Sequence, residues 1–107
     1  LNPQETQGSC TAWLAFPLLI KEGAPFTRKE FQIFLEKRNI QTRVVFTGNI
    51  LRQPMCQNIS KKVLEEGYPN ADAVMARGVL LPLHHGMTDA MFSRFQAAVD
   101  MFTKQYE

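Results

Sequence analysis

The sequence has 107 residues, a length that suits a single domain. Hydrophobic residues make up 45% and charged residues 21%, which is ordinary globular composition and argues against a disordered chain. The net charge of +2 is too small to indicate a nucleic-acid or membrane partner. The two cysteines, Cys10 and Cys56, supply neither a disulfide framework nor the four ligands of a usual structural zinc site. They favour reduced thiols in a cytoplasmic protein.

The beginning of the sequence is polar and then becomes apolar. Residues 1–9 (LNPQETQGS) carry proline and glycine, which predicts a linker. The apolar run that follows is about nine residues long, whereas a membrane-spanning helix needs about 20. No positively charged segment precedes this run, so it is not typical of a signal peptide. Because the sequence begins at Leu1 and not at Met, we expect a processed or excised fragment.

The first predicted elements are a strand and a well-marked helix. Residues 11–20 are apolar and aromatic, which predicts a buried strand, and Pro17 predicts that it lies at a sheet edge or is bulged. Thr27 and Glu30 have capping-box spacing and predict the helix start. The helix is expected to end near Asn39, a residue that tolerates the left-handed conformation.

The middle of the sequence is less regular. Residues 42–46 (TRVVF) are rich in β-branched residues and predict a short strand. Residues 50–57 mix polar and apolar side chains around a proline, which predicts an irregular surface loop. The composition of residues 59–67 does not decide between helix and strand.

The last third predicts a helix, a strand and a helix. Asn70 is the expected cap of a short helix over residues 71–77, with Asp72 favourably placed near its positive end. Residues 79–83 (VLLPL) predict a buried strand. Thr88 is the expected cap of a final amphipathic helix of roughly 17 residues. The order β–α–β–loop–α–β–α predicts an α+β two-layer sandwich, in which helices cover one face of a small antiparallel or mixed sheet of about three strands.

The loop after the second predicted strand carries the most promising polar residues. Residues 47–54 (TGNILRQP) bring Asn49, Arg52 and Gln53 together at a strand end, a place where a rigid scaffold can aim side chains at a ligand. An arginine there can bind a phosphate or carboxylate with two parallel hydrogen bonds. The alternative is a solvated loop without a ligand. No glycine-rich nucleotide-binding motif accompanies the loop.

Two histidines form a second group of candidates. His84 and His85 follow the last strand and precede a helix, but adjacent side chains on extended backbone point to opposite faces, so a shared metal is not expected. One histidine can equally pack or cap while the other is solvated. Cys56 with either histidine would make a thiol–base pair, yet no signature of a catalytic cysteine surrounds Cys56. Without a self-sufficient catalytic set, and with an excess of apolar residues, the domain is expected to dock onto a larger body.

Three segments together resemble a known family: residues 16–31 (FPLLIKEGAPFTRKEF), 40–54 (IQTRVVFTGNILRQP) and 78–88 (GVLLPLHHGMT). They are similar to the C-terminal domain of the DegT/DnrJ/StrS family of pyridoxal-phosphate-dependent sugar aminotransferases. The similarity is strongest to the branch of CDP-4-keto-6-deoxyglucose-3-dehydrases, whose members carry a similar G-N-x-x-R-Q-P element. It covers roughly residues 10–104, so residues 10–107 are expected to be that small domain.

The resemblance implies an aspartate-aminotransferase-like fold, in which the small domain packs beside a large domain of the same polypeptide that binds pyridoxal or pyridoxamine phosphate. The family's anchoring lysine, or the histidine that replaces it in dehydrases, belongs to that large domain, as would any iron–sulfur cysteines. We therefore expect no catalytic, cofactor-binding or metal-binding residue in this sequence, no bound cofactor and no activity of this chain alone. A homodimer is expected for the complete enzyme.

The resemblance also assigns candidate contacts to the nucleotide-sugar substrate, namely Asn49, Arg52 and Gln53 in the loop and His84 and His85 beside the last strand. Two functions stay open. The chain is either part of an enzyme that acts on nucleotide-linked 4-keto-6-deoxy sugars in deoxysugar and lipopolysaccharide biosynthesis, or a free-standing binding module that reuses this domain. Within the first, C-3 dehydration and transamination differ by a lysine or histidine outside this sequence.

Overall fold

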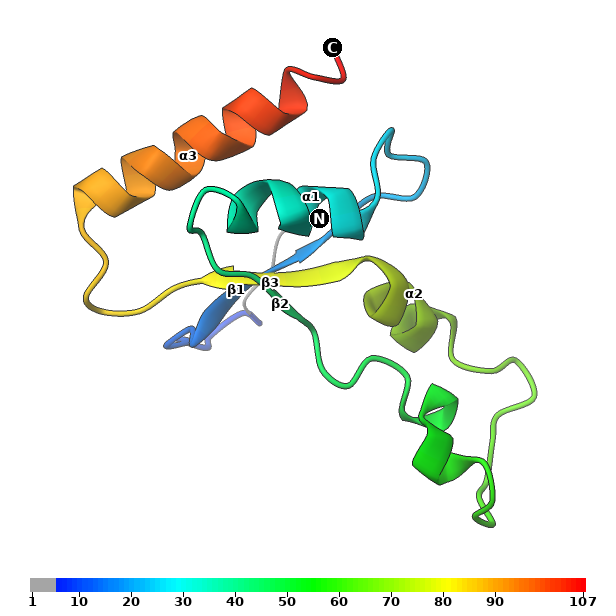
Figure 1. Cartoon of the computed structure of the whole chain (residues 1–107). Coiled ribbons are helices and arrows are strands. Elements are labelled where there is room, and N and C mark those ends of the chain that lie inside the picture. Colours follow the sequence, from blue (N-terminus) through cyan, green and yellow to red (C-terminus); the bar gives the residue numbers. More distant parts are fainter. Residues whose placement is uncertain (1–5) are drawn as a thin grey trace.

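A computed structural model describes residues 6–107 of the chain (Figure 1). The elements follow one another in the order that the sequence predicts. They are strand β1 (Ala15–Leu19), helix α1 (Arg28–Glu36), strand β2 (Arg43–Val44), helix α2 (Pro69–Arg77), strand β3 (Gly78–Pro82) and helix α3 (Asp89–Thr103). Of the predicted linker, residues 1–5 lie outside the described part, and residues 6–9 form a turn in which the Ser9 amide donates to the Thr6 carbonyl over 2.9 Å.

The strands form one antiparallel sheet in the order β1-β3-β2, so β3 is the central strand of the described residues. β1 pairs with β3 along its whole length, with Leu18 opposite Val79. Pro17 lies in an edge strand, as predicted, because proline cannot donate to a second neighbour. Helices α1 and α3 lie on the same side of the sheet (Figure 1). The predicted α+β two-layer sandwich is confirmed, and its sheet is antiparallel.

The hydrophobic core lies between the sheet and these two helices. Its most deeply buried side chains are Leu35 of α1, Val79 of β3 and Phe102 of α3. The ring of Phe102 packs against Phe26 and Phe34, with ring centroids 4.8 and 5.0 Å away. Such aromatic contacts add to the free energy gained by burying the rings. The complete cluster comprises Phe31, Leu35, Ile40, Val79, Leu81, Ala98 and Phe102.

Helix α1 is closed at both ends by the residues that the sequence indicates. The Thr27 amide donates to Glu30 Oε2 over 2.7 Å and the Glu30 amide donates to Thr27 Oγ1 over 3.2 Å, which completes the capping box. At the other end Asn39 adopts a left-handed conformation with φ of 57°, and the Ile40 amide donates to the Leu35 carbonyl over 3.1 Å. This is a Schellman motif, and Ile40 and Leu35 are both buried in the core beside it.

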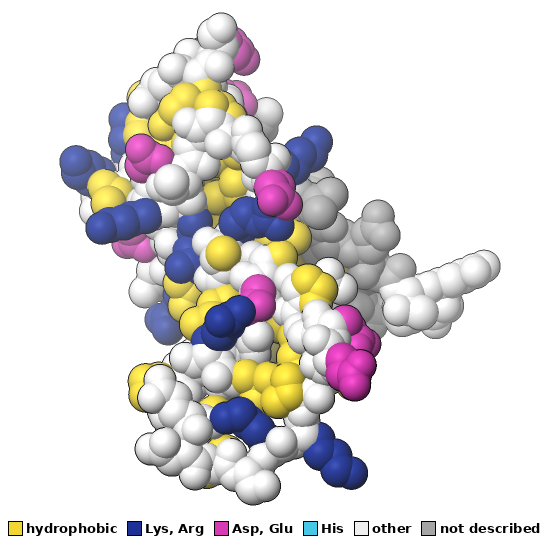
Figure 2. All heavy atoms as spheres, turned by 90° about the vertical axis from the view of Figure 1, so that its right-hand side faces the viewer, with side chains coloured by type: hydrophobic (Ala, Val, Ile, Leu, Met, Phe, Trp, Pro, Cys, Tyr) yellow, Lys and Arg dark blue, Asp and Glu magenta, His cyan; other side chains and the backbone are white. Residues whose placement is uncertain are grey.

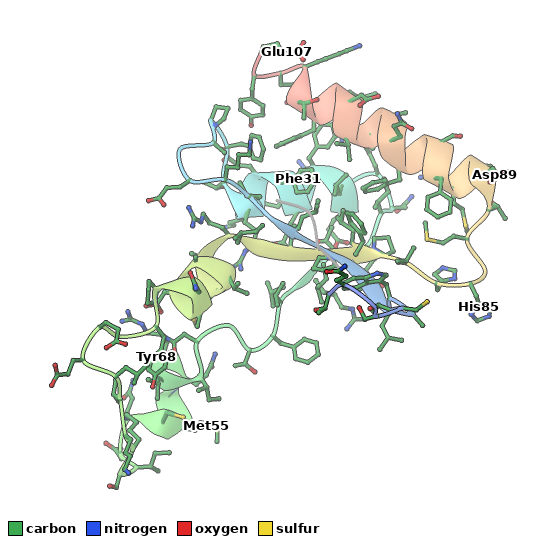
Figure 3. The ribbon with its side chains drawn as sticks, turned by 180° about the vertical axis from the view of Figure 1, so that it is seen from behind. Phe31, Met55, Tyr68, His85, Asp89 and Glu107 are labelled. Carbon is green, nitrogen blue, oxygen red and sulfur yellow. The ribbon has the colours of Figure 1, made fainter. Side chains whose placement is uncertain are left out.

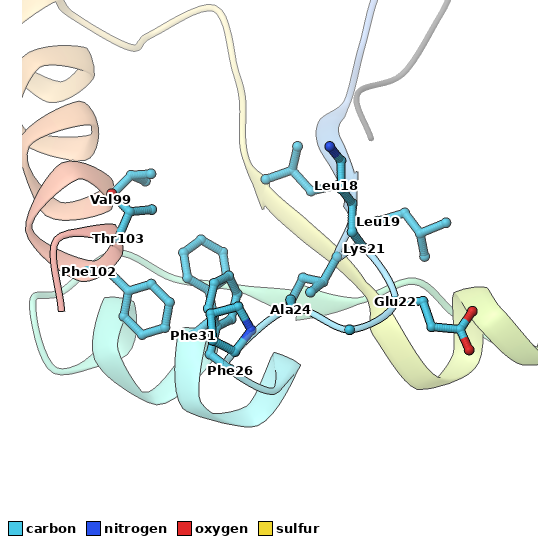
Figure 4. Close-up of a pocket in the computed structure, with 13 residues that line it drawn as sticks. Leu18, Leu19, Lys21, Glu22, Ala24, Phe26, Phe31, Val99, Phe102 and Thr103 are labelled. Carbon is cyan, nitrogen blue, oxygen red and sulfur yellow. The ribbon is translucent and has the colours of Figure 1, made fainter. Parts of the chain in front are cut away.

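An apolar groove of about 460 Å³ opens beside the core, between the turn that follows β1 and the end of α3 (Figure 4). Leu18, Phe26, Phe31, Val99 and Phe102 are among the side chains that line it. No predicted site residue belongs to its lining.

Several predicted boundaries are corrected by the structure. Both outer strands are shorter than predicted, with β1 over Ala15–Leu19 and β2 over Arg43–Val44. Helix α2 starts after Tyr68 and not after Asn70, because Pro69 occupies the first helical position, where a missing N–H breaks no bond. Helix α3 follows its predicted Thr88 cap but has 15 residues, slightly fewer than predicted.

Between β2 and α2 the chain projects away from the sheet, and residues 46–68 are called the arm (green in Figure 1). Its first half contains two single-turn 3₁₀ helices, Ile50–Arg52 and Pro54–Cys56, where the sequence predicted an irregular loop. The Lys61 ammonium group donates to the Cys56 carbonyl, and the Cys56 side chain is buried. Residues 59–67, which the sequence left open, form neither helix nor strand.

Candidate functional site

The arm begins with a close approach to helix α2. Gly48 has a φ of 70°, a left-handed conformation that glycine adopts without strain. A Cβ atom built at this position would lie 2.5 Å from Cβ of Met75, which is shorter than any real contact. Gly48, the glycine of the G-N-x-x-R-Q-P element, therefore has a structural role. Because it has no side chain, the backbone of the arm can pass directly against α2.

Asn49 connects the arm to α2 through its side chain. The residue is only 5% exposed, which makes it the buried polar residue of the described chain. Its Oδ1 accepts from the Leu51 amide over 3.0 Å and so caps the first 3₁₀ turn. Its Nδ2 donates to Oδ1 of Asp72 over 2.9 Å. Both ends of the buried amide are thus hydrogen-bonded inside the chain, as a buried polar group requires.

Arg52 lies one turn further along and bonds to the same carboxylate. Its Nε donates to Asp72 Oδ1 and its Nη2 donates to Asp72 Oδ2, both over 3.0 Å. This is a two-pronged arginine–carboxylate pair. The Arg52 side chain is 65% exposed and the Asp72 side chain 36%, so the pair faces solvent on its outer side. Asn49, Arg52 and Asp72 are called the arm cluster.

The hydrogen bonds within the arm cluster shift the pKa values of Asp72 and Arg52. The hydrogen bond from Arg52 and the one from Asn49 lower the pKa of the Asp72 carboxyl, and the charge of Arg52 acts in the same direction. The hydrogen bond to Asp72, and then its charge, raise the pKa of Arg52. Asp72 also lies in the first turn of α2, where a negative charge is favourable. Both groups are therefore ionised at neutral pH.

Gln53 and a neighbouring cavity complete this region. The Gln53 Nε2 donates to the Thr47 carbonyl over 3.3 Å and closes the loop from within. A cavity of about 350 Å³ lies next to the arm cluster, and its lining includes Asn49, Lys62 and Tyr68. An ammonium group and an aromatic ring are suitable neighbours for an anionic ligand that carries a base.

The two histidines lie elsewhere. Both are exposed, with ring centroids 6.4 Å apart, and Nδ1 of His84 accepts from the Gly86 amide over 3.1 Å. Figure 3 shows His85 at one end of the molecule, with Met55 and Tyr68 at the other. No histidine is visible on the face that carries the arm (Figure 2). The structure therefore brings Asn49, Arg52 and Gln53 together and leaves the histidines apart from them.

This separation also bears on the pairing of Cys56 with a histidine. Cys56 lies in the arm beside Met55, so the described chain forms no thiol–histidine pair there. A cluster of three or more His, Cys, Asp or Glu residues with metal-binding geometry is absent from residues 6–107. None of the helices in the same range has the length and apolarity needed to cross a membrane.

Asp72 is the member of the arm cluster that the sequence does not identify. Its position in a helix N-terminus predicts a favourable charge, which the structure confirms, but not a partner. Arg52 and Asp72 are 20 residues apart, so no local spacing connects them. The one hint in the sequence is an acidic residue in the first turn of the helix that follows a loop containing an arginine.

The fold of this chain occurs as part of a larger protein of known structure. The chain superposes on E. coli GDP-4-keto-6-deoxy-D-mannose-3-dehydratase, a structure with bound hydrated PLP, with a TM-score of 0.73 over 91% of this chain and 24% of that one. At 21% identity, this similarity establishes the shared fold of a small part of a larger protein.

The sequence then establishes the family. Residues 1–100 match the DegT/DnrJ/EryC1/StrS aminotransferase family, and the chain belongs to it. It is 33% identical over 98 residues to the lipopolysaccharide biosynthesis protein RfbH of Salmonella typhimurium. It is 36% identical over 91 residues to dTDP-4-dehydro-2,6-dideoxy-D-glucose 3-dehydratase of Saccharopolyspora spinosa. These matches cover 88% and 85% of this chain but 22% and 20% of the relatives, so the chain spans about a fifth of their length.

Proposed function

We propose that this chain is the small C-terminal domain of a pyridoxal-phosphate-dependent enzyme that acts on nucleotide-linked 4-keto-6-deoxy sugars. The reaction is dehydration at C-3 or transamination, in deoxysugar or lipopolysaccharide biosynthesis. The observation that carries the proposal is the family match over residues 1–100, together with relatives named as a sugar 3-dehydratase and a lipopolysaccharide biosynthesis protein. We place the enzyme in the cytoplasm, in keeping with the free thiols of Cys10 and Cys56. We further propose that the complete enzyme is a homodimer.

The cofactor belongs, in this proposal, to another part of the polypeptide. A pyridoxal phosphate site needs a partner for the pyridine nitrogen, commonly an aspartate. In the arm cluster the carboxylate of Asp72 already accepts hydrogen bonds from Arg52 and Asn49, so it does not fit that role. The bound cofactor supplies the electron sink of the reaction. The residues of this chain bind the substrate, orient it and exclude water.

Arg52 is the proposed contact for the diphosphate of the nucleotide sugar. Its guanidinium group is exposed, always charged and planar, which suits phosphate oxygens. Gln53 and Asn49 belong to the same contact region, and the buried amide of Asn49 serves it by holding the loop in place. His84 and His85 lie at the other end of the molecule, where they contact the domain interface or a separate part of the pocket.

The arm also supplies the surface that docks onto the cofactor-binding part of the enzyme. Large apolar side chains of the arm are exposed to solvent, including Phe46 at 79%, Met55 at 74% and Ile59 at 54%. Figure 2 shows such hydrophobic side chains among Lys and Arg on the face that carries the arm. We propose that these exposed apolar side chains form the interaction site. Relatives about four times as long provide the occupant, namely the rest of the same polypeptide.

An activity assay tests the proposed function. The complete polypeptide that carries this chain is supplied with pyridoxal or pyridoxamine phosphate and 4-keto-6-deoxy nucleotide sugars. We expect it to consume a sugar and release either a product without the C-3 hydroxyl or an amino sugar, and we expect the 107-residue chain alone to be inactive. A complete polypeptide that neither binds the cofactor nor consumes any sugar would contradict the proposal and favour a binding module.

A further inference from the structure

We propose that Asp72 is a positioning residue, which holds the guanidinium group of Arg52 in the orientation that receives the diphosphate of the nucleotide. This inference rests on the proposed function. In this proposal Asp72 itself does not contact the diphosphate, because its carboxylate is also negatively charged and accepts hydrogen bonds from Arg52 and Asn49.

The geometry of the pair leaves one edge of the guanidinium group available. A guanidinium has five N–H donors in a rigid plane. Asp72 accepts from Nε and Nη2, which form one edge of that plane. The second edge, formed by Nη1 and Nη2, carries two parallel N–H groups and points away from Asp72. Because the Arg52 side chain is 65% exposed, this second edge is accessible to a second oxyanion.

Asp72 is in turn fixed by its own surroundings. Its Oδ1 accepts from both Asn49 and Arg52 and its Oδ2 accepts from Arg52, so rotation of the carboxylate would disturb three hydrogen bonds at once. Asn49 is buried and is itself bonded to the Leu51 backbone. The orientation of Arg52 is therefore set by a chain of contacts that ends in the backbone. Fixing a long side chain before binding lowers the entropy lost when the ligand binds.

Charge and orientation predict opposite effects of removing the carboxylate. Asp72 places a negative charge beside the proposed phosphate contact, so in terms of charge alone the Asp72→Asn substitution should strengthen phosphate binding. If Asp72 acts by orienting Arg52, the same substitution should weaken binding. An asparagine has one acceptor oxygen where Asp72 has two, so it cannot reproduce the two parallel hydrogen bonds from Nε and Nη2. The sign of the change therefore separates the two roles.

The test uses the complete polypeptide and titrates it with dTDP or GDP by calorimetry, so that it does not depend on turnover. We expect Asp72→Asn to raise the dissociation constant about tenfold, and Arg52→Ala to raise it by at least as much. In the Arg52→Ala background, Asp72→Asn should have no further effect. Arg52→Lys keeps the charge but not the fork, and we expect it to resemble Arg52→Ala.

A matched control is available in α3. Asp89, like Asp72, lies in the first turn of a helix, so Asp89→Asn removes a comparable charge from a helix N-terminus. It should leave the dissociation constant unchanged. Where substrate turnover is measured, Asp72→Asn should raise KM and leave kcat within about twofold.

Two results would overturn the inference. One is a dissociation constant for Asp72→Asn that equals or falls below that of the unsubstituted protein. The other is an equal effect of Asp72→Asn with and without Arg52, which would indicate a general structural role. Failure of the proposed function looks different, since the protein would then bind the diphosphate with the predicted pattern and still consume no sugar.

Discussion

The sandwich and the arm are each stabilised by a different kind of interaction. In the sandwich, Leu35 and Val79 are completely buried, and Phe102 lies in a group of aromatic rings. In the arm most of the large apolar side chains are exposed, with Phe46 at 79%, while the polar residue Asn49 is buried. The sandwich is thus stabilised by an ordinary hydrophobic core. The arm is held in place by polar side chains that hydrogen-bond to Asp72 of α2.

We propose that this difference separates the residues needed for folding from those needed for function within one short chain. The sandwich has a buried apolar core, and we expect it to be stable by itself because burial of apolar surface is the main favourable contribution to folding. A region that exposes its apolar side chains and fixes its polar groups is arranged for contact with another body. The substitutions below test this division, from the largest expected effect to the smallest.

The largest effect is expected in the core. Phe102→Ala removes the ring at the centre of the aromatic group and should lower the free energy of unfolding by about 3–5 kcal/mol, measured by urea denaturation. The matched substitution Phe46→Ala in the arm should change it by less than about 0.5 kcal/mol. Comparable losses at the two positions would contradict the division between sandwich and arm.

The next effect concerns the buried amide of the arm. Asn49→Asp keeps the size of the side chain but replaces the Nδ2 donor by an oxygen that faces Asp72. We expect a loss of about 1–3 kcal/mol in local stability and faster cleavage within residues 46–68 during limited proteolysis. Asn58→Asp, at an exposed position of the same arm, is the control and should leave the cleavage rate unchanged. Equal rates for both variants would show that the arm cluster does not hold the arm.

A smaller effect is expected at the start of α1. Thr27→Ala removes the hydroxyl that accepts from the Glu30 amide, and it should cost about 1 kcal/mol of unfolding free energy. Thr27→Ser keeps the hydroxyl and should retain most of the stability. Chemical denaturation of the two variants measures both changes. An alanine variant as stable as the serine variant would show that the capping box does not stabilise α1.

The smallest expected effect is the pH dependence of the stability that the Asp72 carboxylate contributes. Because the folded-state pKa of Asp72 is lowered below its ordinary value of about 4, the stabilisation by its charge is present above pH 4 and is lost as the pH falls through the lowered pKa. The difference in unfolding free energy between the unsubstituted chain and Asp72→Asn should therefore shrink on acidification. A difference that stays constant between pH 7 and pH 2 would show that the carboxylate charge contributes nothing.

The sequence predicts the sandwich well because its signals are local. The capping box of Thr27 and Glu30 and the left-handed Asn39 each depend on neighbours a few residues away, and all are confirmed. The short extent of β2 is not predictable in the same way, because pairing with β3 decides where a strand ends.

The candidate site is only half predictable for the same reason. The loop carrying Asn49, Arg52 and Gln53 is marked by its own residues, but its partner Asp72 meets it only through the tertiary fold. The two 3₁₀ turns of the arm were missed because a proline and mixed polarity do not distinguish a turn from a loop. The distance of His84 and His85 from the arm is likewise set by the length and direction of β3.

Hydrogen–deuterium exchange on the complete polypeptide and on the 107-residue chain tests the central claim most directly, namely that the arm is covered by the rest of the enzyme. We predict that backbone amides of residues 46–68 exchange markedly more slowly in the complete polypeptide, while those of α1 and β3 exchange at similar rates in both. Arm amides that exchange equally fast in the two samples would contradict the account.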